Sequence, residues 1–268
     1  MDPSALTTVR YEAADGVATI TLDRPDAYNA FTTTMCEEMA GVWSHVRDDH
    51  DVRAVVLTAA GDKAFCTGID RAEVPAEGGV AYTFDPLTYV DPGRRLGPRS
   101  NECWTPVVAA VNGMACGGAF YMLGEADILV AADHATFFDP HVTYGMPAVF
   151  EPALMLHRMP FGEVMRMTLL GNHERISAAR ALEIGLVTEV VPAAELLGLA
   201  HRIATAIASQ PPTAVQASLR ALWAARELTR GQMLDVGNTF LHLAMTAEAM
   251  AEGQQVFSSG QRIDPKIR

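Results

Sequence analysis

Two short glycine-containing segments of this sequence have the residue types needed to stabilise negative charge on a carbonyl oxygen. The first reads AFCTGID over residues 64–70, and the second reads NGMACGGAF over residues 112–120. Glycine lets the backbone approach a ligand closely, and the first amides of a helix have no partner within it. Two such amides directed at one oxygen form an oxyanion hole. Taken alone, each segment is more typical of a tight turn packed in a core.

The elements before the first glycine segment alternate between strand and helix. Apolar and polar residues alternate over 17–22, which predicts a strand. A helix is predicted from about Thr33, with one of the threonines at 32–34 as its N-cap. The apolar run 54–58 then predicts a short buried strand that leads into the segment.

The second glycine segment lies between a strand and a helix. Residues 106–111 predict a buried strand, and a helix is expected to open at Gly117 and Gly118. Two further strands are predicted over 128–131 and 135–138. Since strand, helix and strand succeed one another, the sheet should be largely parallel with crossover helices, which makes the protein an α/β protein.

The remainder of the chain is predicted to be mostly helical. Ser177 begins a capped helix that Gly185 ends, and a short strand is expected over 189–191. Residues 75–100 are rich in glycine and proline, which predicts a long irregular loop of the kind that often covers a site. Three further helices are predicted, over 195–209, 213–227 and 231–258.

The composition excludes several classes of protein. The 268 residues include 20 Lys and Arg against 32 Asp and Glu, a formal net charge of −12, which argues against a nucleic-acid-binding surface. With 49% hydrophobic residues the chain can build a large core. We expect no signal peptide and no membrane span. The four cysteines form no CxxC pair and are expected to be free thiols in a reducing cytoplasm.

Considered together, these segments resemble the enoyl-CoA hydratase/isomerase (crotonase) superfamily. The resemblance implies an α/β crotonase (ClpP-like) fold, a repeated ββα superhelix with a helical C-terminal region. It also implies an acyl-CoA thioester substrate, no metal or separate cofactor, and a homotrimer or a hexamer made of two trimers. On this basis, residues 1–195 would form the core with the thioester site, and residues 196–268 a helical trimerisation and lid region. The resemblance runs through LDRPDAYNAF, AVVLTAAGDKAFCTGID, TPVVAAVNGMACGGAF, EADILVAADHATFFDPHVTYGMP and SAARALEIGLVTEVV.

The resemblance also assigns site residues. The two oxyanion-hole amides fall on Ile69 and Gly118. Arg24, Arg262 and Lys266 are candidate partners for coenzyme A phosphates, and Tyr82, Phe84 and Tyr89 are candidate walls of the acyl pocket. The positions that match the family's substrate and coenzyme A contacts are Asp26, Ala27, Tyr28, Ala64, Thr67, Gly68, Asp70, Met114 and Gly117.

Two positions depart from the family pattern. A hydratase of this family uses two glutamates to position and activate water, but Tyr121 and His141 stand at these positions here. Imidazole has an unperturbed pKa near 6.5 and can exchange protons at neutral pH, whereas a phenol is more suited to donate a hydrogen bond. We expect His141 to act as the acid/base, with Tyr121 assisting and with Glu151 as a third candidate acid. Asp139 is a candidate to orient His141, although adjacent side chains on a strand point to opposite faces.

Three functions remain open from the sequence. The first is a hydratase-like lyase that stabilises a thioester enolate in the oxyanion hole. The second keeps the hole but cleaves a thioester or a β-dicarbonyl bond, as a hydrolase or decarboxylase. The third is a non-catalytic acyl-CoA binding protein.

Overall fold

The computed structural model describes residues 3–73, 91–260 and 265–267. The chain divides into two compact units, Met1–Thr205 and Ala206–Arg268. This division and the expected boundary after residue 195 both fall within the same helix, α6 (Ala193–Ala208). None of the helices in the described ranges is long and apolar enough to cross a membrane.

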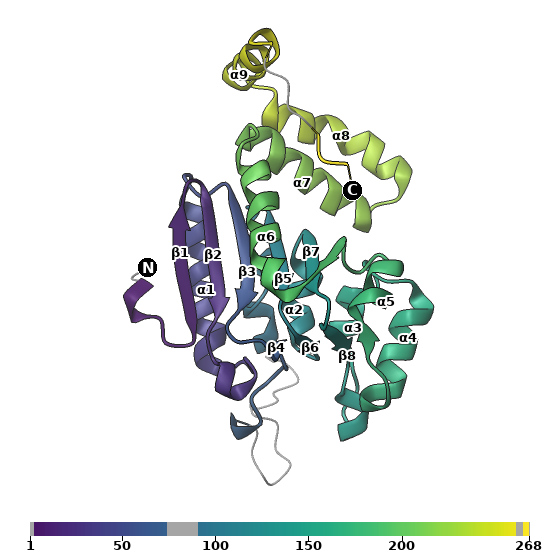
Figure 1. The fold of residues 1–268 in the computed structure, drawn as a ribbon. Helices are drawn as coiled ribbons and strands as arrows, with labels where there is room; N and C mark the ends of the chain where they lie inside the picture. Colours follow the sequence, from purple (N-terminus) through teal and green to yellow (C-terminus); the bar gives the residue numbers. More distant parts are fainter. Residues whose placement is uncertain (1–2, 74–90, 261–264, 268) are drawn as a thin grey trace. The chain divides into compact units, whose positions relative to one another are not determined.

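The first unit is built around a six-stranded sheet with the strand order β1-β2-β3-β5-β7-β10 (Figure 1). β1 and β2 form an antiparallel pair, and every other neighbouring pair is parallel, which confirms the expected, largely parallel α/β sheet. The strands are β1 (Val9–Ala14), β2 (Val17–Leu22), β3 (Ala54–Ala59), β5 (Val107–Val111), β7 (Ile128–Ala132) and β10 (Glu189–Val191).

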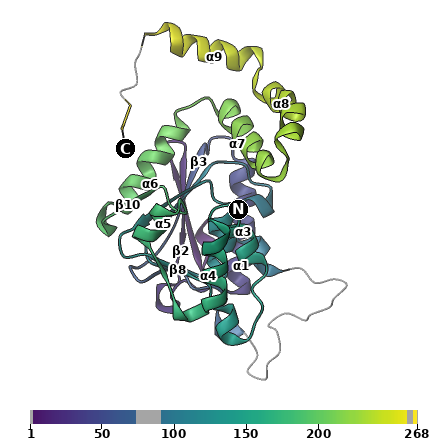
Figure 2. The same cartoon turned by 90° about the vertical axis from the view of Figure 1, so that its right-hand side faces the viewer.

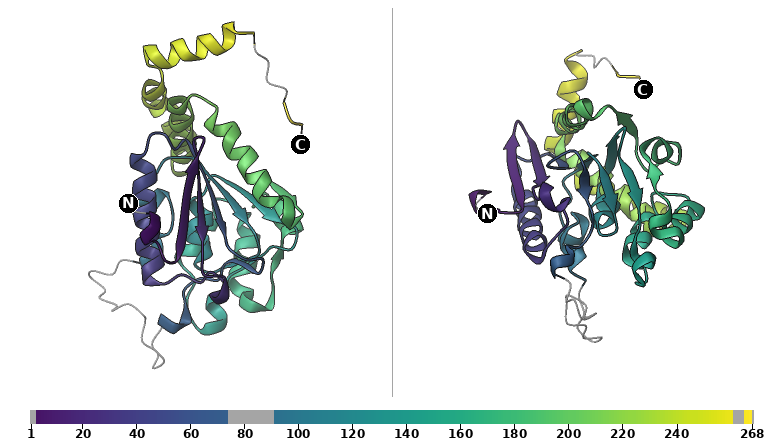
Figure 3. Two further views of the ribbon diagram at one scale, coloured as in Figure 1. Left: turned by 60° about the vertical axis from the view of Figure 1, so that its left-hand side comes forward. Right: turned by 60° about the horizontal axis from the view of Figure 1, so that its bottom comes forward.

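Helices cover both faces of this sheet (Figure 3, left). Helix α1 (Thr33–Asp48) begins where Thr32 accepts a hydrogen bond from the backbone N–H of Met35, as its N-cap. α6 lies on the other face, where His201 is 3.4 Å from Thr19. Because both faces are covered, all six residues of β3 are buried.

A second, smaller sheet has the strand order β4-β6-β8-β9. Each of its first three strands follows directly after a longer strand of the main sheet: β3 leads to β4, β5 to β6 and β7 to β8. β4, β6 and β8 are mutually parallel, while β9 pairs antiparallel with β8. This succession of strand pairs agrees with the repeated ββα unit that the family resemblance implied. The strands are β4 (Ala64–Cys66), β6 (Met114–Cys116), β8 (Thr136–Phe138) and β9 (Ile176–Ser177).

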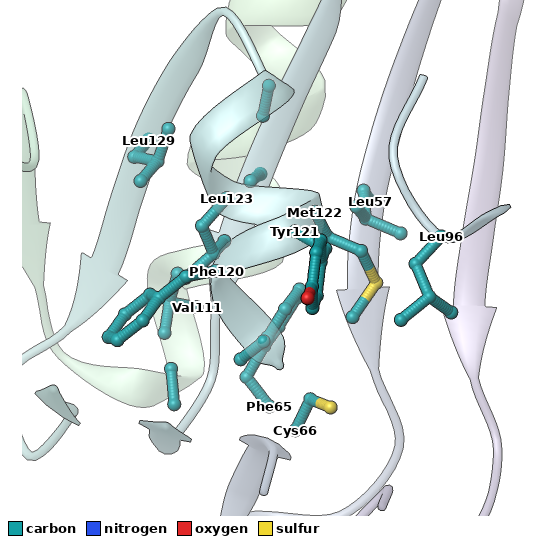
Figure 4. Packing of buried hydrophobic residues seen from close by; sticks show 14 of the residues in the cluster. Leu57, Phe65, Cys66, Leu96, Val111, Phe120, Tyr121, Met122, Leu123 and Leu129 are labelled. Carbon is teal, nitrogen blue, oxygen red and sulfur yellow. The ribbon is translucent and has the colours of Figure 1, made fainter. Parts of the chain in front are cut away.

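The short helix α2 (Ala119–Glu125) is buried along its whole length. Figure 4 shows Tyr121 and Met122 on the side of the helix that faces Leu57 and Leu96. All residues of α2 are buried, because the glycine segment before the helix leads the chain directly into the core. The helix is therefore held rigidly at the point where it begins.

The later helices follow the predicted order, with one correction. Residues 231–258 form two helices rather than one, because Met245 leaves the helical backbone conformation and Thr246 caps a new helix (Figure 2). The remaining helices are α3 (Phe150–Met155), α4 (Phe161–Leu170), α5 (Ala178–Glu183), α7 (Pro212–Glu227), α8 (Arg230–Ala244) and α9 (Ala247–Ser258).

The predicted glycine- and proline-rich loop is only partly described. Its final residues form two single-turn 3₁₀ helices, Pro92–Arg95 and Arg99–Asn101. The three aromatic residues proposed to wall an acyl pocket, Tyr82, Phe84 and Tyr89, lie outside the described residues.

A buried ion pair binds the last part of this loop, residues 91–101, to the main sheet. Arg99 donates to both carboxylate oxygens of Asp127, and the two side chains are only 8% and 11% exposed. Asp127 also accepts a hydrogen bond from the backbone N–H of Val107. Next to this pair, Glu125 accepts from the backbone N–H of Ser100, and burial raises the pKa of its carboxyl group. Both acids hold the loop segment onto α2 and β5.

We expect Asp127→Asn to lower the free energy of unfolding by about 3–5 kcal/mol, because it removes the carboxylate that is hydrogen-bonded to the buried Arg99 guanidinium. Urea unfolding followed by circular dichroism measures this change. The matched control is Glu174→Gln, which removes one partner of the exposed Arg166–Glu174 pair and should change the midpoint little. Equal small effects of the two substitutions would show that the buried pair does not stabilise this segment.

Candidate active site

The two glycine segments meet at the ends of β4 and β6. Gly68 has a positive φ of +83°, and a Cβ atom added to it would lie 3.2 Å from the backbone nitrogen of Gly118. Gly118 is the N-cap of α2. Phe31 donates its N–H to the Gly68 carbonyl and accepts from the N–H of Asp70, which fixes Ile69 between them. Within the described part of the chain, no acceptor takes the amides of Ile69 or Gly118, so both remain able to donate.

His141 lies beside this pair of amides. β8 ends at Phe138, and Pro140 adopts a helical conformation that starts the 3₁₀ helix His141–Tyr144. A Cβ atom added to Gly117 would lie 3.6 Å from Cε1 of the His141 ring. The structure thus brings together Ile69, Gly118 and His141, which the sequence had selected from three separate segments.

Asp139 and His141 are in direct contact, so the expectation that their side chains would point to opposite faces is wrong. His141 Nδ1 lies 2.5 Å from Asp139 Oδ1, and the same oxygen accepts from the His141 backbone N–H at 3.1 Å. Strand side chains alternate between faces for adjacent residues, but Asp139 and His141 are two residues apart, and the chain has also left β8 at Phe138 and turns at Pro140. Asp139 is fully buried, and the His141 side chain is 20% exposed.

Glu151 faces the other nitrogen of the same ring. It lies in the first turn of α3, with Oε1 3.4 Å from His141 Nε2, and its side chain is 8% exposed. The imidazole therefore lies between two buried carboxyl groups that come from either side of the 141–149 segment. The position of Glu151 could not be fixed from sequence, since several turns separate it from His141.

The surroundings shift the pKa of both groups upward. Burial lowers the pKa of His141, but the hydrogen bond to Asp139 and the charges of Glu151, Asp139 and Asp91 outweigh it, so the net shift is upward. Burial raises the pKa of Glu151, and the His141 charge offsets this only in part. Because each favours the charged state of the other, the two groups titrate as a pair.

Tyr121 is bound to a residue that sequence reasoning did not select. Its hydroxyl donates a hydrogen bond to Asp91 Oδ2, and Asp91 Oδ1 accepts from the backbone N–H of Gly93. A Cβ atom on Gly93 would lie 2.3 Å from the Tyr121 ring, so only glycine permits this packing. The only signal in the sequence was the position of Asp91 before a proline and a glycine, which is typical of a turn.

The predicted coenzyme A loop is a short 3₁₀ helix, Pro25–Ala27, which ends at the exposed Tyr28. Asn29, also missed by the sequence analysis, fastens this loop to the neighbouring strands. Its side-chain oxygen accepts from the Arg24 N–H, and its amide donates to the carbonyls of Ala60 and Ala64. Thr67 Oγ1 lies 3.4 Å from the Tyr28 carbonyl. Asp26, Ala27, Tyr28, Ala64 and Thr67 are therefore brought into one region.

The three candidate partners for coenzyme A phosphates, Arg24, Arg262 and Lys266, are not brought together by the described part of the structure. Arg24 forms an ion pair with Asp70 at 2.7 Å and also donates to the Ala30 carbonyl. Its guanidinium is thus already bound within the protein. Lys266 belongs to the second unit, and Arg262 lies outside the described residues.

Met114, another of the predicted substrate-contact positions, lies in β6, where its backbone N–H donates to the Lys63 carbonyl.

Comparison with known proteins places this architecture in a family. The family model described as Enoyl-CoA hydratase/isomerase matches residues 12–263. The (E)-benzylidenesuccinyl-CoA hydratase of Thauera aromatica is 34% identical over 265 residues, which is 97% of this chain and 98% of that protein. The short-chain-enoyl-CoA hydratase of Clostridium acetobutylicum is 34% identical over 247 residues, covering 92% and 89% of the two chains.

Solved structures agree with the sequence comparison. An enoyl-CoA hydratase/isomerase from Mycobacterium paratuberculosis superimposes with a TM-score of 0.88 at 34% identity, covering 98% of this chain and 100% of the other. An enoyl-CoA hydratase from Bacillus anthracis gives a TM-score of 0.84 at 27% identity, covering 94% and 96%. The fold is an α/β crotonase fold, and the chain belongs to the enoyl-CoA hydratase/isomerase (crotonase) superfamily. This confirms the resemblance noted in the sequence.

We expect Glu151→Gln to lower the pKa of His141, because it removes a negative charge that favours the imidazolium. NMR titration of the ring protons measures this pKa in both proteins. Since the pKa in the folded protein is raised, His141 contributes stability that is fully present below about pH 6.5 and is lost as the pH rises through the folded-state pKa. Glu183→Gln, which removes an exposed carboxylate bound to Arg180, should leave the titration unchanged. An unaltered pKa in Glu151→Gln would contradict the pairing.

Proposed function

We propose that this protein is a hydratase-like lyase that adds water to, or removes it from, an acyl-CoA thioester. The observation that carries the proposal is the position of one protonatable imidazole beside two available backbone amides, at the ends of adjacent parallel strands. Family membership supports the thioester as substrate class, and the two relatives compared above are named as CoA hydratases. A carnitinyl-CoA dehydratase of Proteus mirabilis is also 34% identical, over 219 residues.

In this mechanism the thioester oxygen accepts hydrogen bonds from the amides of Ile69 and Gly118. These donors stabilise the negative charge that develops when water adds to the β-carbon of an enoyl-CoA. His141 takes the proton from that water as its oxygen forms the new bond to carbon. The resulting enolate then takes a proton at the α-carbon from the protonated His141–Glu151 pair, which restores the thioester, regenerates the starting state of the pair and completes the addition of one water.

The other residues have supporting roles in the proposal. Glu151 exchanges a proton with His141, and Tyr121 assists by holding Asp91, whose carboxylate accepts the hydrogen bond of the Tyr121 hydroxyl. Gly68 and Gly117 allow the two turns to approach the substrate. Coenzyme A lies along Asp26, Ala27 and Tyr28, with Ala64, Thr67, Asp70 and Met114 beneath it. We further propose a cytoplasmic homotrimer or hexamer in which residues 196–268 take part in assembly and site closure.

A second candidate function is cleavage of a thioester or of a β-dicarbonyl bond. The Asp139–His141 pair favours it, since a carboxylate hydrogen-bonded to Nδ1 is the arrangement by which an imidazole activates a nucleophile in many hydrolases. In that reaction the same two amides would stabilise a tetrahedral oxyanion or an enolate. A non-catalytic acyl-CoA binder remains the outcome if no thioester is turned over.

We expect the protein to convert crotonyl-CoA, or another enoyl-CoA of a small panel, into a product heavier by one water. Mass spectrometry of the CoA products measures this gain. His141→Ala should reduce the rate by about 100- to 10,000-fold, since it removes the proton acceptor. The matched control His173→Ala changes an exposed histidine and should retain the rate. Release of free CoA or carbon dioxide without hydration would favour the second candidate, and binding without turnover the third.

We expect Gly68→Ala to lower kcat by about 100- to 1,000-fold, because the added methyl group crowds the Gly118 amide and displaces one oxyanion donor. Gly185→Ala is the matched control. Gly185 has a similar positive φ of +78° against +83° for Gly68, but a Cβ atom there meets nothing within 4 Å. Both variants lose stability through backbone strain, and only the first should lose activity. Equal kinetics in the two variants would exclude the Gly118 amide as a donor.

A further inference from the structure

We propose that Asp139 is a positioning residue that keeps a proton on Nδ1 of His141, so that Nε2 is the atom that exchanges protons in the site. The role of this arrangement in catalysis rests on the proposed function. The location of the proton does not, because it is a property of the protein without substrate. The two can therefore be tested separately.

The burial of Asp139 is the first argument. Its side chain has no exposed surface, and Oδ2 has no hydrogen-bond partner among the described residues. A carboxylate removed from water is costly unless a charged or strongly polarised donor compensates it. The Nδ1–H group of His141, 2.5 Å from Oδ1, is such a donor. A ring with Nδ1 deprotonated would place a lone pair against the carboxylate and lose this compensation.

The backbone is the second argument. Asp139 Oδ1 also accepts from the N–H of His141, two residues further along the chain, which is the hydrogen bond of an Asx turn. Pro140 between them restricts the turn, since its ring limits the range of φ, which is −86° here. The same oxygen is thus held against both the backbone and the ring of His141. This double contact fixes which edge of the imidazole faces the buried carboxylate.

The opposite edge of the ring then faces the site. With the proton on Nδ1, a neutral His141 has its lone pair on Nε2, facing the Glu151 carboxyl group at 3.4 Å in its protonated form, which burial favours. A proton accepted there forms an imidazolium between Asp139 and Glu151. Three carboxyl groups bear on it, from three elements: Asp139 at the end of β8, Glu151 in α3 and Asp91, which caps the 3₁₀ helix at 92–95 and binds Tyr121. They favour the charged ring, and burial opposes it.

The decisive experiment determines which ring nitrogen carries the proton. Two-bond ¹H–¹⁵N correlation spectra of the ligand-free protein separate protonated from unprotonated ring nitrogens, and comparison with His141→Asn assigns the signals. The neutral ring in the unmodified protein should be protonated at Nδ1. In Asp139→Asn, the pKa of His141 should fall, and the proton should no longer be confined to Nδ1, because a side-chain amide can also donate to that atom.

Kinetics provide the second readout. Asp139→Asn should lower kcat by about 100- to 10,000-fold with little change in KM, and the acidic limb of the kcat/KM profile should move to lower pH. The matched control is Asp133→Asn, which changes the exposed partner of His134 and should alter neither value. A merely structural Asp139 would change the melting temperature without moving the pH profile.

A neutral ring protonated at Nε2 in the unmodified protein overturns the inference, even if Asp139→Asn does not fold. An unmoved pH profile in a folded Asp139→Asn variant with normal kcat also overturns it. If Nδ1 carries the proton but no thioester is turned over, the inference stands and the proposed function fails.

Discussion

The parallel pairing of three very short strands is the constraint on which the candidate site depends. β4, β6 and β8 are neighbours in the smaller sheet, and their carboxyl ends lie at the same edge. Ile69, Gly118 and His141 each follow one of these strands within a few residues. Parallel strands place their carboxyl ends at one edge of the sheet. The sheet therefore brings the three residues, which are far apart in sequence, into one region, and direct contacts between them are not needed for this. The larger sheet and its covering helices hold the three strands in register.

Close packing at glycines is the second constraint. A Cβ atom on Gly118 would overlap the Phe31 ring at 2.3 Å, and one on Gly68 would make a tight contact of 3.2 Å with the Gly118 nitrogen. Two further glycines, outside these turns, are also tightly packed: a Cβ atom on Gly93 would overlap Tyr121, and one on Gly97 would overlap Glu125. These last two glycines looked like ordinary loop residues in the sequence. Their packing role became visible only once the segment was seen against α2.

At the two positions where the family resemblance led us to expect glutamates, the chain has Tyr121 and His141, and carboxyl groups lie close to both. Asp91, Asp139 and Glu151 supply them from three other positions, around the one imidazole of His141. The region therefore carries carboxyl groups although neither of these two positions is a glutamate. A buried imidazole among several carboxyl groups holds its proton more tightly than one in water, whereas an isolated buried imidazole would lose it more readily. The opposing effects of burial and of the carboxyl charges therefore set how readily His141 takes and gives a proton.

The sequence by itself determined the α/β class, the order of most elements and the two glycine turns, because periodicity, caps and glycines act locally. It failed at residues 245–246, where a predicted single helix is broken, since the apolar pattern continues across the break. Only the tertiary structure decided the partners of His141 and Tyr121. Pro140 turns Asp139 back onto the imidazole, and the chain path after residue 145 brings Glu151 to its other edge. Such pairings depend on turns and on packing between distant segments, and neither has a repeating pattern that sequence can show.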